Sequence, residues 1–254
     1  MNFFKPLGLC LVMMLAMTVA ANAATTIAQF DFKKAGGFVA GTNDLTRWIS
    51  QQNIALEFSA DWQIESDALR NVSGAEAAGL RPDEAASNAT VRAGVAVVFA
   101  EELNVRMAIF TGEHGGVARL ANREFGGESG LAETSGAAEG VRTRVNGTWG
   151  ASLPQNEWVV FSFVFPSDVS LQNAVLFADP KNFWRRGFVG KVASLVLIGE
   201  GEVSDDALAG IEKAEARRFG VAGFTPATDA ERKAAKNIGG YNTHNAWSSL
   251  FLIK

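Results

Sequence analysis

Residues 156–165 read NEWVVFSFVF and carry the clearest strand pattern of the chain. Successive side chains of a strand point to opposite faces of its sheet. That alternation gives two sets, Trp158, Val160, Ser162 and Val164 on one face and Val159, Phe161, Phe163 and Phe165 on the other. Both sets are largely apolar, which is typical of a strand buried on both sides. The stretch therefore predicts a central strand between sheet layers.

The same period of two recurs along most of the chain. In residues 26–32 (TIAQFDF), Ala28, Phe30 and Phe32 share a face, whereas residues 91–100 (VRAGVAVVFA) are almost continuously apolar. The other predicted strands are residues 104–111, 116–123, 140–146, 173–178, 187–198 and 246–253. The pair 104–111 and 116–123 is expected to form a hairpin. Residues 124–140 have loop composition with room for one short strand, and the arginines of 140–146 predict one wet, basic face.

Helical signals come only near the end. Ser204 is a candidate N-cap followed by two aspartates, and Gly220 supplies a stop. A second short helix is predicted to open at Thr228, where Glu231 completes a capping box, and to end at residues 239–240. The prediction is an all-β fold, a two-sheet antiparallel jelly-roll sandwich with one or two short helices near the C-terminus.

The first residues have the pattern of an export signal. Lys5 precedes an apolar run, and Ala21-Asn22-Ala23 has the small-residue form of a cleavage site. We therefore expect residues 1–23 to be a signal peptide and residues 24–254 to be one secreted, periplasmic or cell-envelope domain. No later stretch is long and apolar enough to predict a membrane span.

Composition after that cleavage narrows the chemistry. The single cysteine, Cys10, lies in the predicted signal, so the mature chain would have no disulfide and no thiolate metal site. The formal charge of −4 becomes −5 without Lys5. A mildly acidic chain with no block of basic residues lacks the electrostatic footprint of a nucleic-acid-binding protein.

Residues 188–221 read FVGKVASLVLIGEGEVSDDALAGIEKAEARRFGV. This segment resembles the C-terminal signature of bacterial LamG-like, concanavalin A-like jelly-roll domains, in which an F-x-G-x-[IV]-A-x-[LIV] strand precedes S-D and a helix that closes on an aromatic residue and glycine. The matching positions are Phe188, Gly190, Val192, Ala193, Ser204, Asp205, Phe219 and Gly220. Residues 153–165 resemble the family's loop into a central strand. A tyrosine and a leucine common in the closing helix are replaced by Ala214 and Glu215.

The resemblance implies a protein that recognises carbohydrate or another polymer. Glucanases of this fold have E-x-D-x-x-E on one strand, whereas here Glu65 and Asp67 are followed by no third acid. The expectation is therefore a non-catalytic binding module of the lectin kind. The alternatives left open are a structural or adhesive domain with a protein partner, and a polysaccharide hydrolase with a dispersed active site.

Candidate ligand-binding residues follow from aromatic side chains with polar neighbours, since such rims mark binding sites. Trp184 has polar neighbours in residues 179–186 (DPKNFWRR), and Trp62 lies between Asp61 and Gln63. His114 follows Glu113 on the glycine-rich tip of the predicted hairpin. The predicted site residues are Trp184, Asp179, Asn182, Arg185, Trp62 and His114.

No cofactor is predicted from these residues. The two histidines, His114 and His244, are too far apart in sequence for a short-spaced metal pair. Calcium is the metal that loops at the edge of a sandwich would suit, and Asp61, Asp67 and Asp179 lie near strand ends. No D-x-D-x-D-G loop accompanies them, so their reading as ordinary turn residues stays open.

Overall fold

The structure is a computed structural model. It describes residues 24–32, 47–50, 52, 54–57, 62–65, 68–71, 79–86, 88–102, 108–111, 119–123, 130–133, 141–172, 174–178 and 188–242. The predicted signal peptide (1–23) and the predicted last strand (246–253) lie outside these residues. Within them, no helix is both long enough and apolar enough to cross a bilayer.

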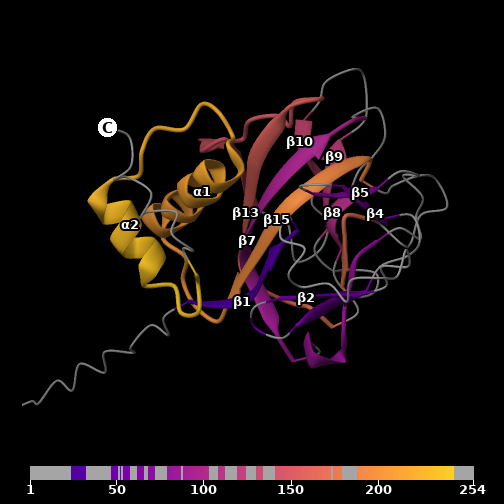
Figure 1. Ribbon diagram of the computed structural model, residues 1–254. Helices are drawn as coiled ribbons and strands as arrows, with labels where there is room; N and C mark the ends of the chain where they lie inside the picture. Colours follow the sequence, from indigo (N-terminus) through magenta and orange to yellow (C-terminus); the bar gives the residue numbers. More distant parts are fainter. Residues whose placement is uncertain are drawn as a thin grey trace, which may run out of the picture.

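The described chain is built of strands followed by two helices (Figure 1). The first strands are β1 (Thr25–Asp31), β2 (Arg47–Ile49), β3 (Ala55–Glu57), β4 (Trp62–Ile64), β5 (Leu69–Asn71), β6 (Arg81–Pro82) and β7 (Thr90–Ala100), with a 3-10 turn at Glu84–Ala86. The later strands are β8 (Ala108–Thr111), β9 (Arg119–Arg123), β10 (Gly130–Glu133), β11 (Arg142–Val145), β12 (Thr148–Trp149), β13 (Trp158–Ser170), β14 (Val175–Leu176) and β15 (Gly190–Gly199). Helices α1 (Asp205–Phe219) and α2 (Asp229–Lys236) follow.

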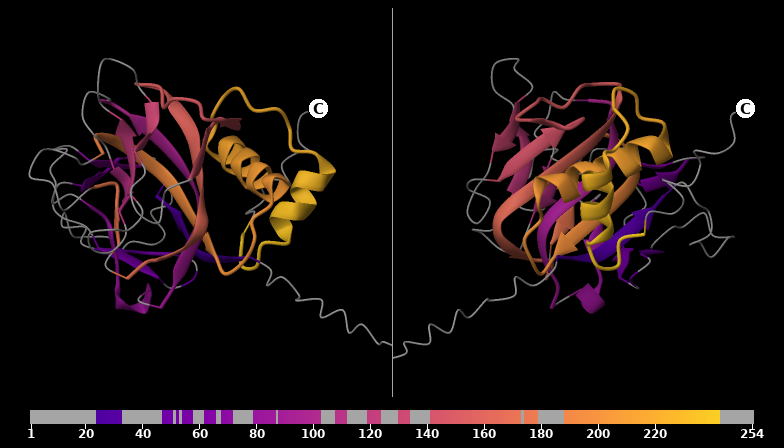
Figure 2. Two further views of the ribbon diagram at one scale, coloured as in Figure 1. Left: turned by 180° about the vertical axis from the view of Figure 1, so that it is seen from behind. Right: turned by 90° about the vertical axis from the view of Figure 1, so that its left-hand side faces the viewer.

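The strands form one large antiparallel sheet and two small ones. The large sheet has the order β12-β11-β13-β7-β15-β5-β4, and β1 also pairs with β15. The small sheets have the orders β10-β9-β8-β14 and β2-β3-β6, and two hydrogen bonds between Leu80 and Leu176 join them. The small sheets lie on one side of the large sheet and the helices on the other (Figure 2). The predicted β-sandwich with helices near the C-terminus is confirmed.

Strand β13 lies between β11 and β7 in the large sheet, and its two faces have the predicted composition. Val159, Phe161, Phe163 and Phe165 belong to the core shared with the small sheets, whereas Val160 and Val164 belong to a second core beneath the helices. Phe110 of β8 ties the layers together, because its ring centroid lies 5.2 Å from that of Phe165. The prediction of a strand covered on both sides is confirmed.

Helix α1 closes the other face of the large sheet. Ser204 caps its start by accepting a hydrogen bond from the amide of Ala207 (3.1 Å), and Gly220 ends it in the left-handed region at φ 69°. Ala207, Leu208, Ile211 and Ala214 are buried against the valines of β7 and β13. Both predicted caps are confirmed, and so is the capping box of Thr228 and Glu231 at the start of α2.

Some boundaries differ from those expected. Strand β13 continues to Ser170, and α2 ends at Lys236 with Asn237 as its cap rather than at residues 239–240. The predicted hairpin is confirmed as β8 paired with β9, and the loop between residues 124 and 140 contains the short strand β10. The prediction that residues 140–146 have one solvent-exposed, basic face is wrong in part. Arg142 is exposed, whereas Arg144 is buried because α1 covers it.

Gly94 tests the packing between β7 and β13. A methyl group at this position would lie 2.4 Å from the ring of Phe163, which is itself buried. Gly94→Ala should therefore lower the free energy of unfolding by about 1–3 kcal/mol, the usual cost of overpacking a core. In a Phe163→Leu background the same substitution should cost less, because the clashing ring is gone. Urea denaturation of the four proteins measures this coupling; equal costs in both backgrounds would contradict the packing.

Candidate functional site

Most of the predicted site lies outside the described residues. Asp179, Asn182, Trp184 and Arg185 fall between residues 178 and 188, and His114 falls between residues 111 and 119. Their prediction as ligand-binding residues stays a prediction. The described residues on either side of 179–187 are in contact, since the amide of Phe188 donates a hydrogen bond to the carbonyl of Phe177 (2.8 Å).

Trp62 is described, and its position corrects the prediction. Trp62 is only 3% exposed, and it belongs to the core between the sheets. The ring packs edge-on against Phe177 at 6.2 Å between centroids, and Phe177 packs in the same way against Phe188 at 5.5 Å. A ring buried on this scale has no open face for a ligand, so Trp62 stabilises the sandwich instead.

A bulge in β13 opens a pocket on the helix-covered face of the sheet. Val164 pairs with Ala93 and Val169 pairs with Val91, so residues 165–168 of β13 oppose the single residue Arg92 of β7. Pro166 lies inside this bulge, where its missing N–H breaks no regular pairing. Bulges of this kind redirect side chains and occur often next to functional sites.

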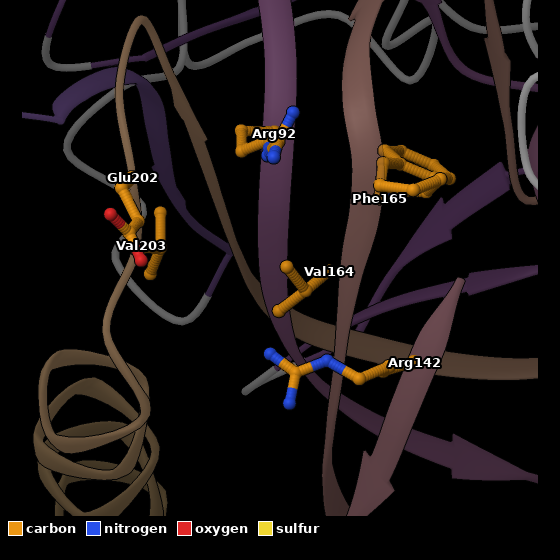
Figure 3. A pocket seen from close by; sticks show the side chains of 7 residues that line it. Arg92, Arg142, Val164, Phe165, Glu202 and Val203 are labelled. Atoms are coloured by element: carbon orange, nitrogen blue, oxygen red, sulfur yellow. The ribbon is translucent and has the colours of Figure 1, made fainter. Parts of the chain in front are cut away.

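The pocket has a volume of about 240 Å³ and is formed by β7, β11, β13 and the connection from β15 to α1 (Figure 3). Its lining residues are Arg92, Arg142, Val164, Phe165, Pro166, Glu202 and Val203. Val164 and Val203 are buried and supply an apolar floor, while Arg142 and Glu202 are exposed at the sides. The volume is below the ~300–1,000 Å³ of pockets for drug-sized ligands, so the pocket suits one small polar unit.

Each guanidinium group of the pocket has a carboxylate neighbour. Arg92 lies 3.7 Å from Asp168 in the bulge, and Arg142 lies 3.3 Å from Asp205 at the start of α1. Exposed pairs such as Arg142–Asp205 contribute only about 0–1 kcal/mol, because water competes for both partners. The donors therefore remain available to a ligand that offers hydrogen-bond acceptors.

An exposed tryptophan adjoins the pocket. Trp149 of β12 is 36% exposed, the one large apolar side chain in the described parts of the chain with that exposure. The guanidinium carbon of Arg142 lies 4.3 Å from the centroid of its ring, and that of Arg144 lies 4.9 Å away. Arg142 thus contacts both the pocket and the ring.

The sequence contains a local signal for the position of this tryptophan, the Asn146-Gly147 pair. Asn146 and Gly147 have φ of 48° and 78°, the left-handed values of a two-residue hairpin turn in which Asn-Gly is preferred. That turn fixes the register and pairs Trp149 with Arg144. Once the Asn-Gly turn is recognised in the sequence, the hairpin register follows, and this register places Trp149 beside Arg144 on the same face of the sheet.

Glu212 of α1 is part of a buried polar network between the helix and the large sheet. The hydroxyl of Ser162 donates a hydrogen bond to the Glu212 carboxyl, and Arg144 lies 3.3 Å from it. Burial raises the pKa of Glu212, while Ser162 and Arg144 act in the opposite direction. The residue is 1% exposed, so this carboxyl group is sealed from the pocket and from solvent.

Glu215 has a similar environment one turn later. The hydroxyl of Tyr241 donates a hydrogen bond to it (3.1 Å), and Arg218, which is paired with Asp31 of β1, lies 3.8 Å away. Burial raises the pKa of Glu215, and burial together with this carboxylate raises the pKa of Tyr241 well above its ordinary value. Where the family resemblance implies a leucine, this chain thus has a buried acid with its own partners.

The candidate metal ligands can be compared with the described part of the chain. No group of three or more histidine, cysteine, aspartate or glutamate side chains comes together there. Asp61, Asp67 and Asp179, the residues considered for calcium, all lie outside it.

The comparisons with known proteins give one distant structural similarity. No family model matches the chain, and no curated protein matches it. One solved structure is similar: domain 4 of a GH43 extracellular arabinanase from Geobacillus stearothermophilus, in complex with arabinotriose. The similarity covers 72% of this chain and 96% of that domain, with 17% sequence identity and a TM-score of 0.41.

Stability should depend on pH through Glu212. Because its pKa is raised in the folded state, the protein loses stability as pH rises from the unfolded pKa to the folded pKa. Glu212→Gln removes that titration. The free energy of unfolding of the variant, relative to the native chain, should therefore rise over the pH range that begins at the ordinary pKa of a glutamate, about 4.3.

Urea denaturation across this range measures the difference, and Glu84→Gln serves as the control for loss of one exposed carboxylate. The sign of the change with pH carries the test, since the variant also loses the Arg144 pair. A difference that stays constant, or that falls as pH rises, would contradict the buried carboxyl group.

Proposed function

We propose that this chain is a non-catalytic carbohydrate-binding β-sandwich protein and that the pocket beside the β13 bulge is its sugar site. The observation that carries the proposal is the composition of the pocket. Arg92 and Arg142 supply donors and Glu202 supplies an acceptor around the apolar floor of Val164 and Val203. A sugar has hydroxyl groups, which both donate and accept hydrogen bonds, around apolar C–H faces. Such a ligand complements both parts of the pocket.

The position of the buried acids supports a binding role rather than hydrolysis. A glycosidase needs a general acid with a raised pKa in contact with the scissile bond. Glu212 and Glu215 have raised pKa values, but both are 1% exposed beneath α1. A polysaccharide cannot reach them while the helix is packed on the sheet.

The family and the location are also proposals, and they rest on sequence patterns. We place the chain among LamG-like, concanavalin A-like domains because of the motif in residues 188–221, in which Ser204 and Gly220 cap α1. The N-terminal pattern of residues 1–23 supports export to the periplasm, envelope or exterior. A glycan or another surface polymer is the partner that a sugar-binding domain would meet there.

Glycan binding should depend on the two pocket arginines. Arg92→Ala and Arg142→Ala should each weaken binding about tenfold or more, since each removes charge-assisted hydrogen bonds worth about 1.5–3 kcal/mol. Arg81→Ala is the matched control, because Arg81 is exposed on β6 in the opposite layer. A glycan array with the mature chain selects the ligand, and calorimetry measures the affinities.

Loss of binding in both pocket variants, with the thermal unfolding midpoint retained, is the expected result. Binding that survives both substitutions would place the sugar site elsewhere. A chain that retains no glycan on the array and releases no reducing sugar from polysaccharides, yet co-purifies with a protein, would favour the adhesive alternative.

A further inference from the structure

We infer that the ligand is an uncharged glycan chain of at least two sugar units, one in the pocket and the next against Trp149. This inference rests on the proposed function and extends it to the class of carbohydrate. It is carried by two observations, the continuity of the pocket with an exposed aromatic ring and the balance of charge around the pocket.

The continuity runs through Arg142. This side chain lines the pocket, and its guanidinium carbon lies 4.3 Å from the Trp149 ring. A ligand that accepts a hydrogen bond from Arg142 in the pocket is therefore separated from the Trp149 ring only by the Arg142 side chain. Aromatic faces favour contact with the C–H face of a sugar, and 36% of Trp149 is exposed.

The ring is held in place before any ligand arrives. Arg144 supports it at 4.9 Å and is itself fixed by a hydrogen bond to the carbonyl of Gly147 (2.9 Å) and by its pair with buried Glu212 (3.3 Å). Preorganised groups lose less conformational entropy on binding. Trp149 therefore has the properties of a second subsite.

The balance of charge favours an uncharged ligand. The positive groups at the pocket are Arg92 and Arg142, and the carboxylates that line it or pair with these arginines are Glu202, Asp168 and Asp205. A uronate or sulfated sugar would have to displace Asp168 or Asp205 and would then lie near their negative charge, and opposing like charges is costly. Hydroxyl groups can bond to both signs at once.

The test compares ligand length and charge on the mature chain. Using the sugar type selected by the array, calorimetry is carried out with the monosaccharide, the neutral trisaccharide and a trisaccharide of the corresponding uronic acid. The native chain should bind the neutral trisaccharide about tenfold or more tightly than the monosaccharide, and more tightly than the uronate. Trp149→Ala should weaken trisaccharide binding about tenfold and monosaccharide binding less than about twofold.

Trp149→Phe keeps an aromatic face and should retain most of the trisaccharide affinity, which separates loss of the ring contact from loss of folding. Equal affinity of the native chain and Trp149→Ala for the trisaccharide would overturn the second subsite. Preference for the uronate would overturn the assignment to uncharged glycans. Both results leave the sugar site itself standing, whereas the absence of any glycan binding would reject the proposed function.

Discussion

The central strands β7, β13 and β15 are apolar on both faces, and this constraint shapes the rest of the molecule. A sheet of this composition has to be covered twice, since exposing either face would leave rows of valine and phenylalanine in water. The small sheets cover one face through contacts such as Phe110 with Phe165. Helix α1 follows β15 in the chain and covers the other face. The pocket arises where this cover begins.

Covering the second face with α1 buries charge as well as apolar surface. Glu212 and Glu215 face the sheet, and each is matched by an arginine and a hydroxyl group: Arg144 and Ser162 for the first, Arg218 and Tyr241 for the second. Buried ion pairs often add little net stability, but removing one partner is costly. Their directional bonds fix how α1 lies on the strands. Arg144 of this network also contacts the Trp149 ring, so the packing of α1 and the proposed site share this residue.

The period of two in residues 26–32, 91–100 and 156–165 is a local property, and the strands there could be predicted from sequence. The caps at Ser204, Gly220 and Thr228 are local too. The burial of Arg144 cannot be predicted locally, because the helix that covers it is some sixty positions later in the chain. The polar residues that flank Trp62 in sequence predict an exposed ring, whereas its ring packs against Phe177, far along the chain. Pro166 within an apolar strand was a readable sign of the bulge.

Hydrogen–deuterium exchange of the mature chain, with and without a neutral trisaccharide that it binds, locates the sugar site on the fold. The trisaccharide should slow exchange around Arg92, in the β11–β12 hairpin and in residues 202–205, with little change in the strands of the small sheets. Slowing confined to residues 179–187, around Trp184, would contradict the pocket as the site and would restore the segment that the sequence first indicated.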